Sequence, residues 1–168
     1  MLQLRPYQEC DAVEVGRLIA ETFRKFNLAY ASSEEQERLL GPFRHAGSDR
    51  EEHRDAIANI IKATWVLVAE QDGEIVGVLR GSPGRLHSLF VREDRHRNGI
   101  GRMLMRELER MSRDKGADTL TMQSSLYAVP FYKSLGYKTD GAVQYGDCFD
   151  GADFPYQPMR KDLRPRAV

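Results

Sequence analysis

The stretch LHSLFVREDRHRNGIGR, residues 86–102, leads from an apolar run through two closely spaced glycines into a helical pattern. The spacing predicts a strand over 85–91 and a helix that begins at Ile100 and ends near Gly116. The first N–H groups of a helix lack internal partners, and the helix dipole favours an anion there. Gly99 and Gly101 allow the backbone to approach a phosphate closely. The stretch therefore predicts a phosphate or pyrophosphate site where the strand meets the helix.

Charged residues surround this loop, and the positive ones outnumber the negative ones. They are Arg92, Arg95, Arg97 and Arg102, partly offset by Glu93 and Asp94. The loop lacks the Gly-Lys-Ser/Thr ending of a Walker A loop, and no third glycine completes the GxGxxG dinucleotide fingerprint. The competing interpretation is a strand-to-helix turn that needs flexible residues and binds nothing.

The N-terminal part of the chain combines one short strand with three helices. Leu2 and Leu4 alternate with a polar residue in a strand that ends at Pro6. Each helix is predicted from a pair of residues with the spacing of a capping box. The three pairs are Asp11 with Glu14, Ser32 with Glu35, and Ser48 with Glu51.

Strand signals dominate from residue 65 onward, with a turn at 71–73 that predicts a hairpin. A short helix is expected from Pro130 to Gly136. The expected strands cover 65–69, 75–79, 85–91, 119–123, and the closing segments around 137–145 and 154–161. This order predicts an α+β fold, an α/β arrangement with a mixed sheet, and the length of 168 residues predicts a single domain over 1–168.

The composition is that of an ordinary soluble globular protein, with 41% hydrophobic and 30% charged residues. Lys plus Arg and Asp plus Glu both number 25, so the basic excess of a general nucleic-acid binder is absent. The two cysteines, Cys10 and Cys148, suggest neither a disulfide framework nor a zinc site, and no metal is expected. No signal peptide or membrane-spanning run is recognised. A cytoplasmic protein with reduced thiols, and with neither nucleic acid nor membrane as a partner, is expected.

Two motifs in order resemble the GNAT superfamily of acyl-CoA N-acyltransferases. The run LFV at 89–91 followed by HRNGIG at 96–101 is similar to its strand and pyrophosphate loop, and AVPFYKSLGY at 128–137 is similar to its later helix with a tyrosine. The order of elements also fits over nearly the whole chain. His96 departs from the usual Gln or Arg, and Ser125 stands where many members have Asn.

The resemblance implies a GNAT fold with a central twisted mixed sheet flanked by helices, and acetyl-CoA as co-substrate. It implies that the pantetheine arm pairs with the backbone of residues 89–91 and that the pyrophosphate sits on the amides of 97–102. The cofactor-binding residues implied are Leu89, Phe90, Val91, His96, Arg97, Asn98, Gly99, Ile100, Gly101, Arg102 and Ser125. A homodimer is one oligomeric state that the resemblance suggests.

An amine that attacks a thioester needs a neutral nitrogen, a polarised carbonyl and a proton for the departing thiolate. A backbone N–H near Phe90 or Val91 is expected to polarise the carbonyl, and Tyr132 to protonate the thiolate, because a phenol is protonated at neutral pH. His87, on the strand beside the site, is the candidate base. The alternatives are that Tyr132 is a packed aromatic and that His87 is a structural histidine.

The predicted function is transfer of an acetyl group from acetyl-CoA to a primary amine, on a small molecule or a peptide, by direct attack in a ternary complex. The alternative enzyme is a protein N-terminal or lysine acetyltransferase, and the alternative of another class is a non-catalytic acyl-CoA-binding or sensor module. The segment 139–159 contains no Lys or Arg, and its aspartates suggest a cationic acceptor. They are Asp140, Asp147, Asp150 and Asp153.

Overall fold

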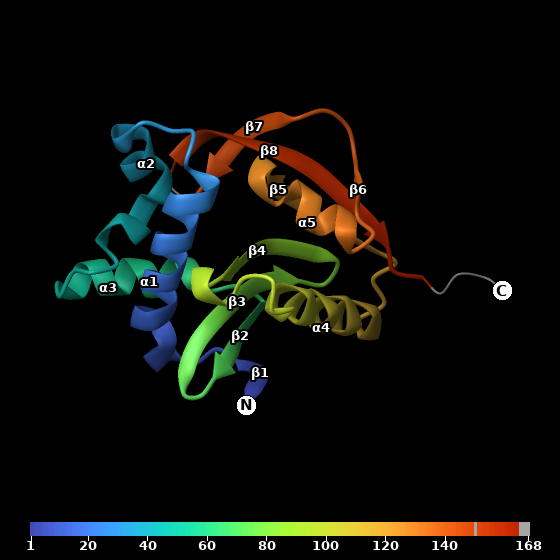
Figure 1. Cartoon of the computed structure of the whole chain (residues 1–168), viewed down its shortest axis with the longest axis horizontal. Coiled ribbons are helices and arrows are strands. Elements are labelled where there is room, and N and C mark those ends of the chain that lie inside the picture. Colours follow the sequence, from blue (N-terminus) through green and yellow to red (C-terminus); the bar gives the residue numbers. More distant parts are fainter. Residues whose placement is uncertain (150, 165–168) are drawn as a thin grey trace.

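The computed structural model describes residues 1–149 and 151–164. Its strands form a mixed sheet in the order β1-β2-β3-β4-β5-β8-β6, and β7 pairs with β8 (Figure 1). Among the pairs described, β4 and β5 run parallel and the others run antiparallel. The strands are β1 (Leu2–Pro6), β2 (Trp65–Gln71), β3 (Glu74–Ser82), β4 (Arg85–Val91), β5 (Thr119–Ser125), β6 (Lys138–Thr139), β7 (Gln144–Cys148) and β8 (Gly151–Asp162).

Helices cover both faces of this sheet, with the N-terminal helices on one side and α4 on the other (Figure 1). The α-helices are α1 (Ala12–Thr22), α2 (Ser33–Leu40), α3 (Glu51–Ile61), α4 (Ile100–Asp114) and α5 (Val129–Ser134). The short 3-10 turns are η1 (Glu9–Asp11), η3 (Gly41–His45), η4 (Glu93–Arg95) and η5 (Leu126–Ala128), and η2 (Phe23–Asn27) is a π-turn that continues α1.

Two apolar clusters pack against opposite faces of the sheet. On β3, Ile75 and Val78 join the cluster under α1 to α3, whereas Val76 and Leu79 join the cluster under α4. Successive side chains of a strand point to opposite faces, so a strand buried on both sides reads as a continuous apolar run. The α+β mixed-sheet prediction is therefore confirmed, with helices on both faces. None of the helices among the described residues is long and apolar enough to span a membrane.

One of the three predicted capping boxes forms as expected, at the start of α2. Ser32 Oγ accepts from the Glu35 N–H, and the Glu35 carboxylate accepts from the Ser32 N–H. The box predicted from Asp11 and Glu14 is wrong. The Asp11 carboxylate instead accepts from Arg5 and from the Gln8 N–H, one turn earlier than predicted.

Other hydrogen bonds, one of them between distant parts of the chain, replace the two capping boxes that do not form. The Glu14 carboxylate does not cap the helix. It accepts from the N–H of Ile75 at 2.7 Å and so links α1 to β3. The Ser48 hydroxyl lies too early for the cap, because α3 begins only at Glu51. It accepts from the Arg50 N–H at 3.2 Å and bonds the ring of His53 at 2.8 Å.

Candidate active site

The parallel strands β4 and β5 separate soon after they meet. The only residue pair in register between them is Arg85 with Thr121, at their beginnings. Beyond that point β4 stays paired with β3 up to Val91, while β5 pairs with β8. The edge of β4 that faces β5 is therefore open, and a pocket of about 670 Å³ lies beside it.

His87 is the extra residue of a β-bulge in β4. Arg80 on β3 lies opposite Ser88 and Gly81 lies opposite Leu86, so His87 has no partner in the register. Its ring is exposed, and Nε2 lies 3.1 Å from Ser82 Oγ. Partial burial lowers the pKa of His87, and the charge of Arg80 lowers it further. The imidazole is thus held neutral at physiological pH, as a base must be.

Backbone direction along β4 decides which amides face the open edge. The Arg92 N–H donates to the Val76 carbonyl on the β3 side. Because N–H groups alternate in direction along a strand, the Phe90 N–H points the same way, and those of Leu89 and Val91 point to the open edge. The Val91 carbonyl accepts from Nε2 of His96 at 2.7 Å. Of the two residues expected to supply an outward N–H, Val91 does so and Phe90 does not. Leu89 supplies a second outward N–H.

The loop between η4 and α4 presents a row of unused backbone donors. Arg97 and Gly99 have φ of +64° and +80°, which turn the chain tightly before α4 begins at Ile100. Within 1–149 and 151–164, no group accepts from the N–H groups of residues 97–102. The next amide, of Met103, donates to the Gly99 carbonyl at 2.9 Å. Six consecutive donors at a helix N-terminus form a concave site suited to an anion.

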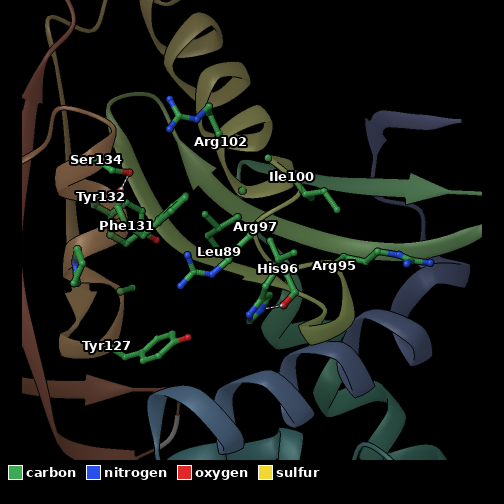
Figure 2. A pocket seen from close by; sticks show the side chains of 15 residues that line it. Leu89, Arg95, His96, Arg97, Ile100, Arg102, Tyr127, Phe131, Tyr132 and Ser134 are labelled. Carbon is green, nitrogen blue, oxygen red and sulfur yellow. Dashed lines mark hydrogen bonds between the residues drawn. The ribbon is translucent and has the colours of Figure 1, made fainter.

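Two of the four arginines predicted around this loop are neutralised by acidic neighbours. Arg92 pairs with Glu74 and Asp94, and Nη1 of Arg95 lies 3.8 Å from Asp94. Figure 2 shows the Arg95 side chain extending away from α5. Arg95 lines the pocket together with Arg97 and Arg102, but Arg97 and Arg102 have no carboxylate within 4.0 Å in the described part of the chain. The net positive charge of the site comes from this second pair.

Helix α5 forms the opposite wall of the pocket and packs closely on the start of α4. A Cβ added at Gly101 would lie 3.0 Å from the Phe131 ring, so glycine is needed for this contact. Tyr132 on the same helix is only 5% exposed, yet it lines the pocket (Figure 2). Burial raises the pKa of its phenol, and no described group hydrogen-bonds the hydroxyl. This hydroxyl stays protonated and is available to a ligand.

Most of the predicted cofactor-binding residues come together in this pocket. Those that line it are Leu89, Val91, His96, Arg97, Gly99, Ile100, Gly101 and Arg102. Two aromatic side chains that also line it, Tyr127 and Phe131, had no role in the prediction. The sequence offered one signal for them, the concentration of aromatic residues around the predicted acid at Tyr132.

Four predicted site residues are not among those lining the pocket. Asn98 is exposed in the loop, and Phe90 is buried under α1, where its ring meets Phe23 edge-on at 5.8 Å. Ser125, at the end of β5, accepts from the Asn27 amide at 2.6 Å. His87 lies on the bulge, as described. For Phe90 the reason is strand alternation, because its neighbours Leu89 and Val91 face the pocket side.

The β7–β8 hairpin carries acidic side chains on the far side of β5. Asp147 and Asp153 of the hairpin are exposed, as is Asp140 in the segment between β6 and β7, and none of the three forms an ion pair within the described ranges. Asp150 lies outside the described residues. Cys148, also on β7, is largely enclosed, and burial raises the pKa of its thiol to about 12, which makes it a poor nucleophile. Across the described residues, no group of three His, Cys, Asp or Glu side chains is arranged to hold a metal ion.

The sequence resembles two curated proteins that are named as N-acetyltransferases. It is 32% identical over 79 residues to YjcF of Bacillus subtilis, an uncharacterized N-acetyltransferase, a match that covers 47% of this chain and 54% of that protein. The chain thus spans about half the length of YjcF. It is 26% identical over 132 residues to YjaB of Salmonella typhimurium, a peptidyl-lysine N-acetyltransferase, covering 72% of this chain and 89% of that protein.

Solved structures share the fold at lower sequence identity. A GCN5-related N-acetyltransferase from Rhodopseudomonas palustris superposes with a TM-score of 0.76 at 23% identity, covering 95% of this chain and 94% of that one. The PaiA N-acetyltransferase of Thermoplasma acidophilum, solved with coenzyme A, gives 0.70 at 18% identity, covering 96% and 99%. The family model of the acetyltransferase (GNAT) domain matches residues 30–163. The chain therefore belongs to the GNAT acetyltransferase family.

Proposed function

We propose that this protein transfers an acetyl group from acetyl-CoA to a primary amine by direct attack in a ternary complex. One observation carries the proposal. The loop of unpaired amides at residues 97–102, the open edge of β4 and Tyr132 border one pocket, which all these loop residues except Asn98 line. A diphosphate, an extended amide-containing arm and a thiolate leaving group need these three features in turn. Coenzyme A carries all three groups in that order.

The pyrophosphate would bind the amides of 97–102, with Arg97 and Arg102 adding positive charge. The pantetheine arm would add to the open edge of β4 as an extra strand, because its amides match the free N–H and C=O groups there. The Leu89 carbonyl and the N–H groups of Leu89 and Val91 are available for this pairing. The neighbour PaiA is named as a complex with coenzyme A, which supports the same class of co-substrate.

The chemical step then needs three proton and charge movements. The amine nitrogen forms a bond to the thioester carbon, and an outward N–H of Leu89 or Val91 stabilises the negative charge on the carbonyl oxygen. The carbon–sulfur bond breaks, and the Tyr132 hydroxyl gives its proton to the leaving thiolate. The proton lost by the amine passes to His87. His87 is not among the pocket-lining residues, and the proton reaches it directly or through a water molecule.

Two measurements test this function together. Calorimetry with coenzyme A should give saturable binding, and a panel of amines added with acetyl-CoA should release free thiol only when an acceptor is present. Binding without thiol release from any amine would favour the acyl-CoA-binding or sensor module. No binding of coenzyme A at all would refute the proposal.

A second acceptor class, lysine side chains of proteins, has one specific observation in its favour. The relative YjaB, which matches 72% of this chain, is named as a peptidyl-lysine N-acetyltransferase. The unpaired aspartates of the β7–β8 hairpin would suit a cationic peptide. Mass spectrometry of lysine-containing peptides incubated with acetyl-CoA separates this acceptor from small amines, and N-terminal acetylation is distinguished by the site of the added mass.

A further inference from the structure

The π-turn η2 touches both walls of the pocket, although it contributes no residue to the pocket lining. Toward the β4 wall, Lys25 pairs with Glu93 at 2.6 Å, and the Phe26 ring lies 4.9 Å from that of His96. Toward the β5 wall, the same Phe26 ring lies 5.4 Å from that of Tyr127. Thus one ring, Phe26, bridges two pocket-lining rings that come from opposite sides.

A hydrogen bond next to this ring strengthens the link to the β5 wall. The Asn27 amide donates to Ser125 Oγ at 2.6 Å, across 98 positions of sequence. Ser125 is the last residue of β5, immediately before the turn η5 that carries Tyr127. Both Phe26 and Asn27 are half-buried, so their contacts are partly shielded from water. Figure 2 shows Tyr127 and His96 near the blue ribbon of the N-terminal helix, with the pocket between the walls above it.

The β4 side of the bridge is held rigid by the hydrogen bond of His96. A carbonyl oxygen only accepts, so Nε2 of His96 carries the proton in its bond to Val91. Phe26 therefore packs on a ring whose orientation is fixed to the end of β4.

The two walls need such a link because no strand pairing joins them at this end. After the pair Arg85 and Thr121, the sheet gives no contact in register between β4 and β5. We propose that Phe26 and Asn27 are positioning residues that hold the two walls at the separation that acyl-CoA requires. This inference rests on the proposed function. When the bridge is removed, a smaller fraction of the molecules has the spacing that binds acyl-CoA. The apparent affinity falls in proportion to that fraction.

The test compares five single variants by calorimetry with coenzyme A and by steady-state kinetics with varied acetyl-CoA. Phe26→Ala removes both ring contacts and should raise Kd for coenzyme A and KM for acetyl-CoA about threefold to thirtyfold, with kcat within about twofold. Phe26→Tyr keeps the ring and should restore wild-type values. Arg24→Ala is the matched control, since Arg24 lies on the same turn but pairs with Glu37 of α2.

Asn27→Ala provides a variant that leaves the ring bridge in place. It should raise KM for acetyl-CoA about twofold to fivefold, and Ser125→Ala should do the same, because each removes one end of a single hydrogen bond. The double variant should be no worse than either single one, as expected for two directly coupled residues. Thermal unfolding of every variant is followed in parallel.

The outcomes separate this inference from the proposed function. If the wild-type protein does not bind coenzyme A, the proposed function itself is wrong. If it binds, the inference is overturned by wild-type KM in Phe26→Ala and Asn27→Ala, or by a fall in kcat with KM unchanged. It is also overturned if Arg24→Ala raises KM as much as Phe26→Ala does. If Phe26→Ala fails to fold, the Asn27 and Ser125 cycle decides by the same criteria.

Discussion

Tyr132 is a phenol enclosed in the wall of an open pocket, and this setting suits a proton donor. Burial raises its pKa, so the hydroxyl keeps its proton until a thiolate appears beside it. His87 has the opposite requirement, because a base must be neutral before it acts, and its lowered pKa meets that requirement. At the scale of single residues, the two shifts favour a protonated phenol and a neutral imidazole, the starting forms that the proposed acid and base require.

Tyr132→Phe keeps the ring and removes the proton. We expect kcat to fall by about 10²–10⁴-fold, the usual contribution of proton transfer, with the affinity for coenzyme A nearly unchanged. Steady-state kinetics and calorimetry on the same preparation measure the two quantities. A fall in kcat of less than about threefold would show that Tyr132 is a packed aromatic residue and not the proton donor.

His87→Ala is expected to change the pH profile of kcat/KM. Because the base acts when neutral, kcat/KM of the wild type should rise with pH through a pKa below the ordinary histidine value of about 6.5. That acidic limb should be missing in the variant. Should both proteins show the same limb, the substrate amine or another group is responsible for it.

Among the elements, the contact between the start of α4 and helix α5 shapes the pocket most directly. Gly101→Glu would push a side chain against Phe131, which already lies 3.0 Å from the position of a Cβ, and would add negative charge to the anion site. We expect the heat of coenzyme A binding to disappear while far-UV circular dichroism is retained. Gly47→Glu is the control, because a Cβ there meets nothing within 4 Å. Unchanged affinity in folded Gly101→Glu would exclude this loop as the cofactor site.

The first strand and the first helix are joined by one charged cluster. The Asp11 carboxylate is nearly buried and accepts from Arg5 at 2.7 and 3.0 Å and from the Gln8 N–H at 2.7 Å. The hydrogen bonds from Arg5 lower the pKa of Asp11 below its ordinary 3.8. A lowered pKa means that the stabilisation is present above the unfolded-state value and is lost as the pH falls through the folded-state value.

Asp11→Asn should therefore lower the free energy of unfolding by about 1–3 kcal/mol at pH 7, and by less near pH 3. Urea unfolding at the two pH values measures the difference. Asp72→Asn is the matched control, because its ion pair with the N-terminus is exposed and should contribute little. An equal loss at both pH values would show that packing, and not charge, accounts for the effect.

At the scale of the whole molecule, the unpaired charges at the pocket and those on the β7–β8 hairpin differ in sign. The unpaired arginines Arg97 and Arg102 lie at the pocket, and the unpaired aspartates Asp147 and Asp153 lie on the β7–β8 hairpin. This separation would draw an anionic cofactor and a cationic acceptor to different parts of the surface. Solvated carboxylates without a partner are the alternative explanation of the hairpin.

Replacing Asp147 and Asp153 by Asn should raise KM for polyamines or basic peptides, with little change for neutral amines or coenzyme A. The preference of the wild type for cationic acceptors should weaken with added salt, since the screening length is only about 10 Å at 0.1 M. Initial rates at several ionic strengths measure both effects. Equal, salt-independent rates on neutral and cationic amines would rule out electrostatic steering.

Much of the fold can be predicted from local patterns in the sequence. The β2–β3 hairpin, the strand β4, the turn before α4 and the helix after Pro130 all form where the spacing predicts them. Each depends on residues near to one another in the chain, such as the glycine with positive φ at Gly99. The two failed capping boxes mark the limit of such reasoning, because Asp11 and Glu14 are both held by side-chain or backbone groups outside the predicted box.

For the site, the sequence by itself indicated the glycine loop at 97–102 and the later motif that contains Tyr132, because each motif is a run of neighbouring residues. Tertiary structure decided which arginines remain unpaired, since Arg92 finds Glu74 on the neighbouring strand. It also decided that Ser125 meets Asn27, 98 positions away, and that Phe26 bridges two walls of the pocket. These contacts have no sequence signal because the residues approach one another only after the sheet has brought β4 and β5 together and α1 has packed across them.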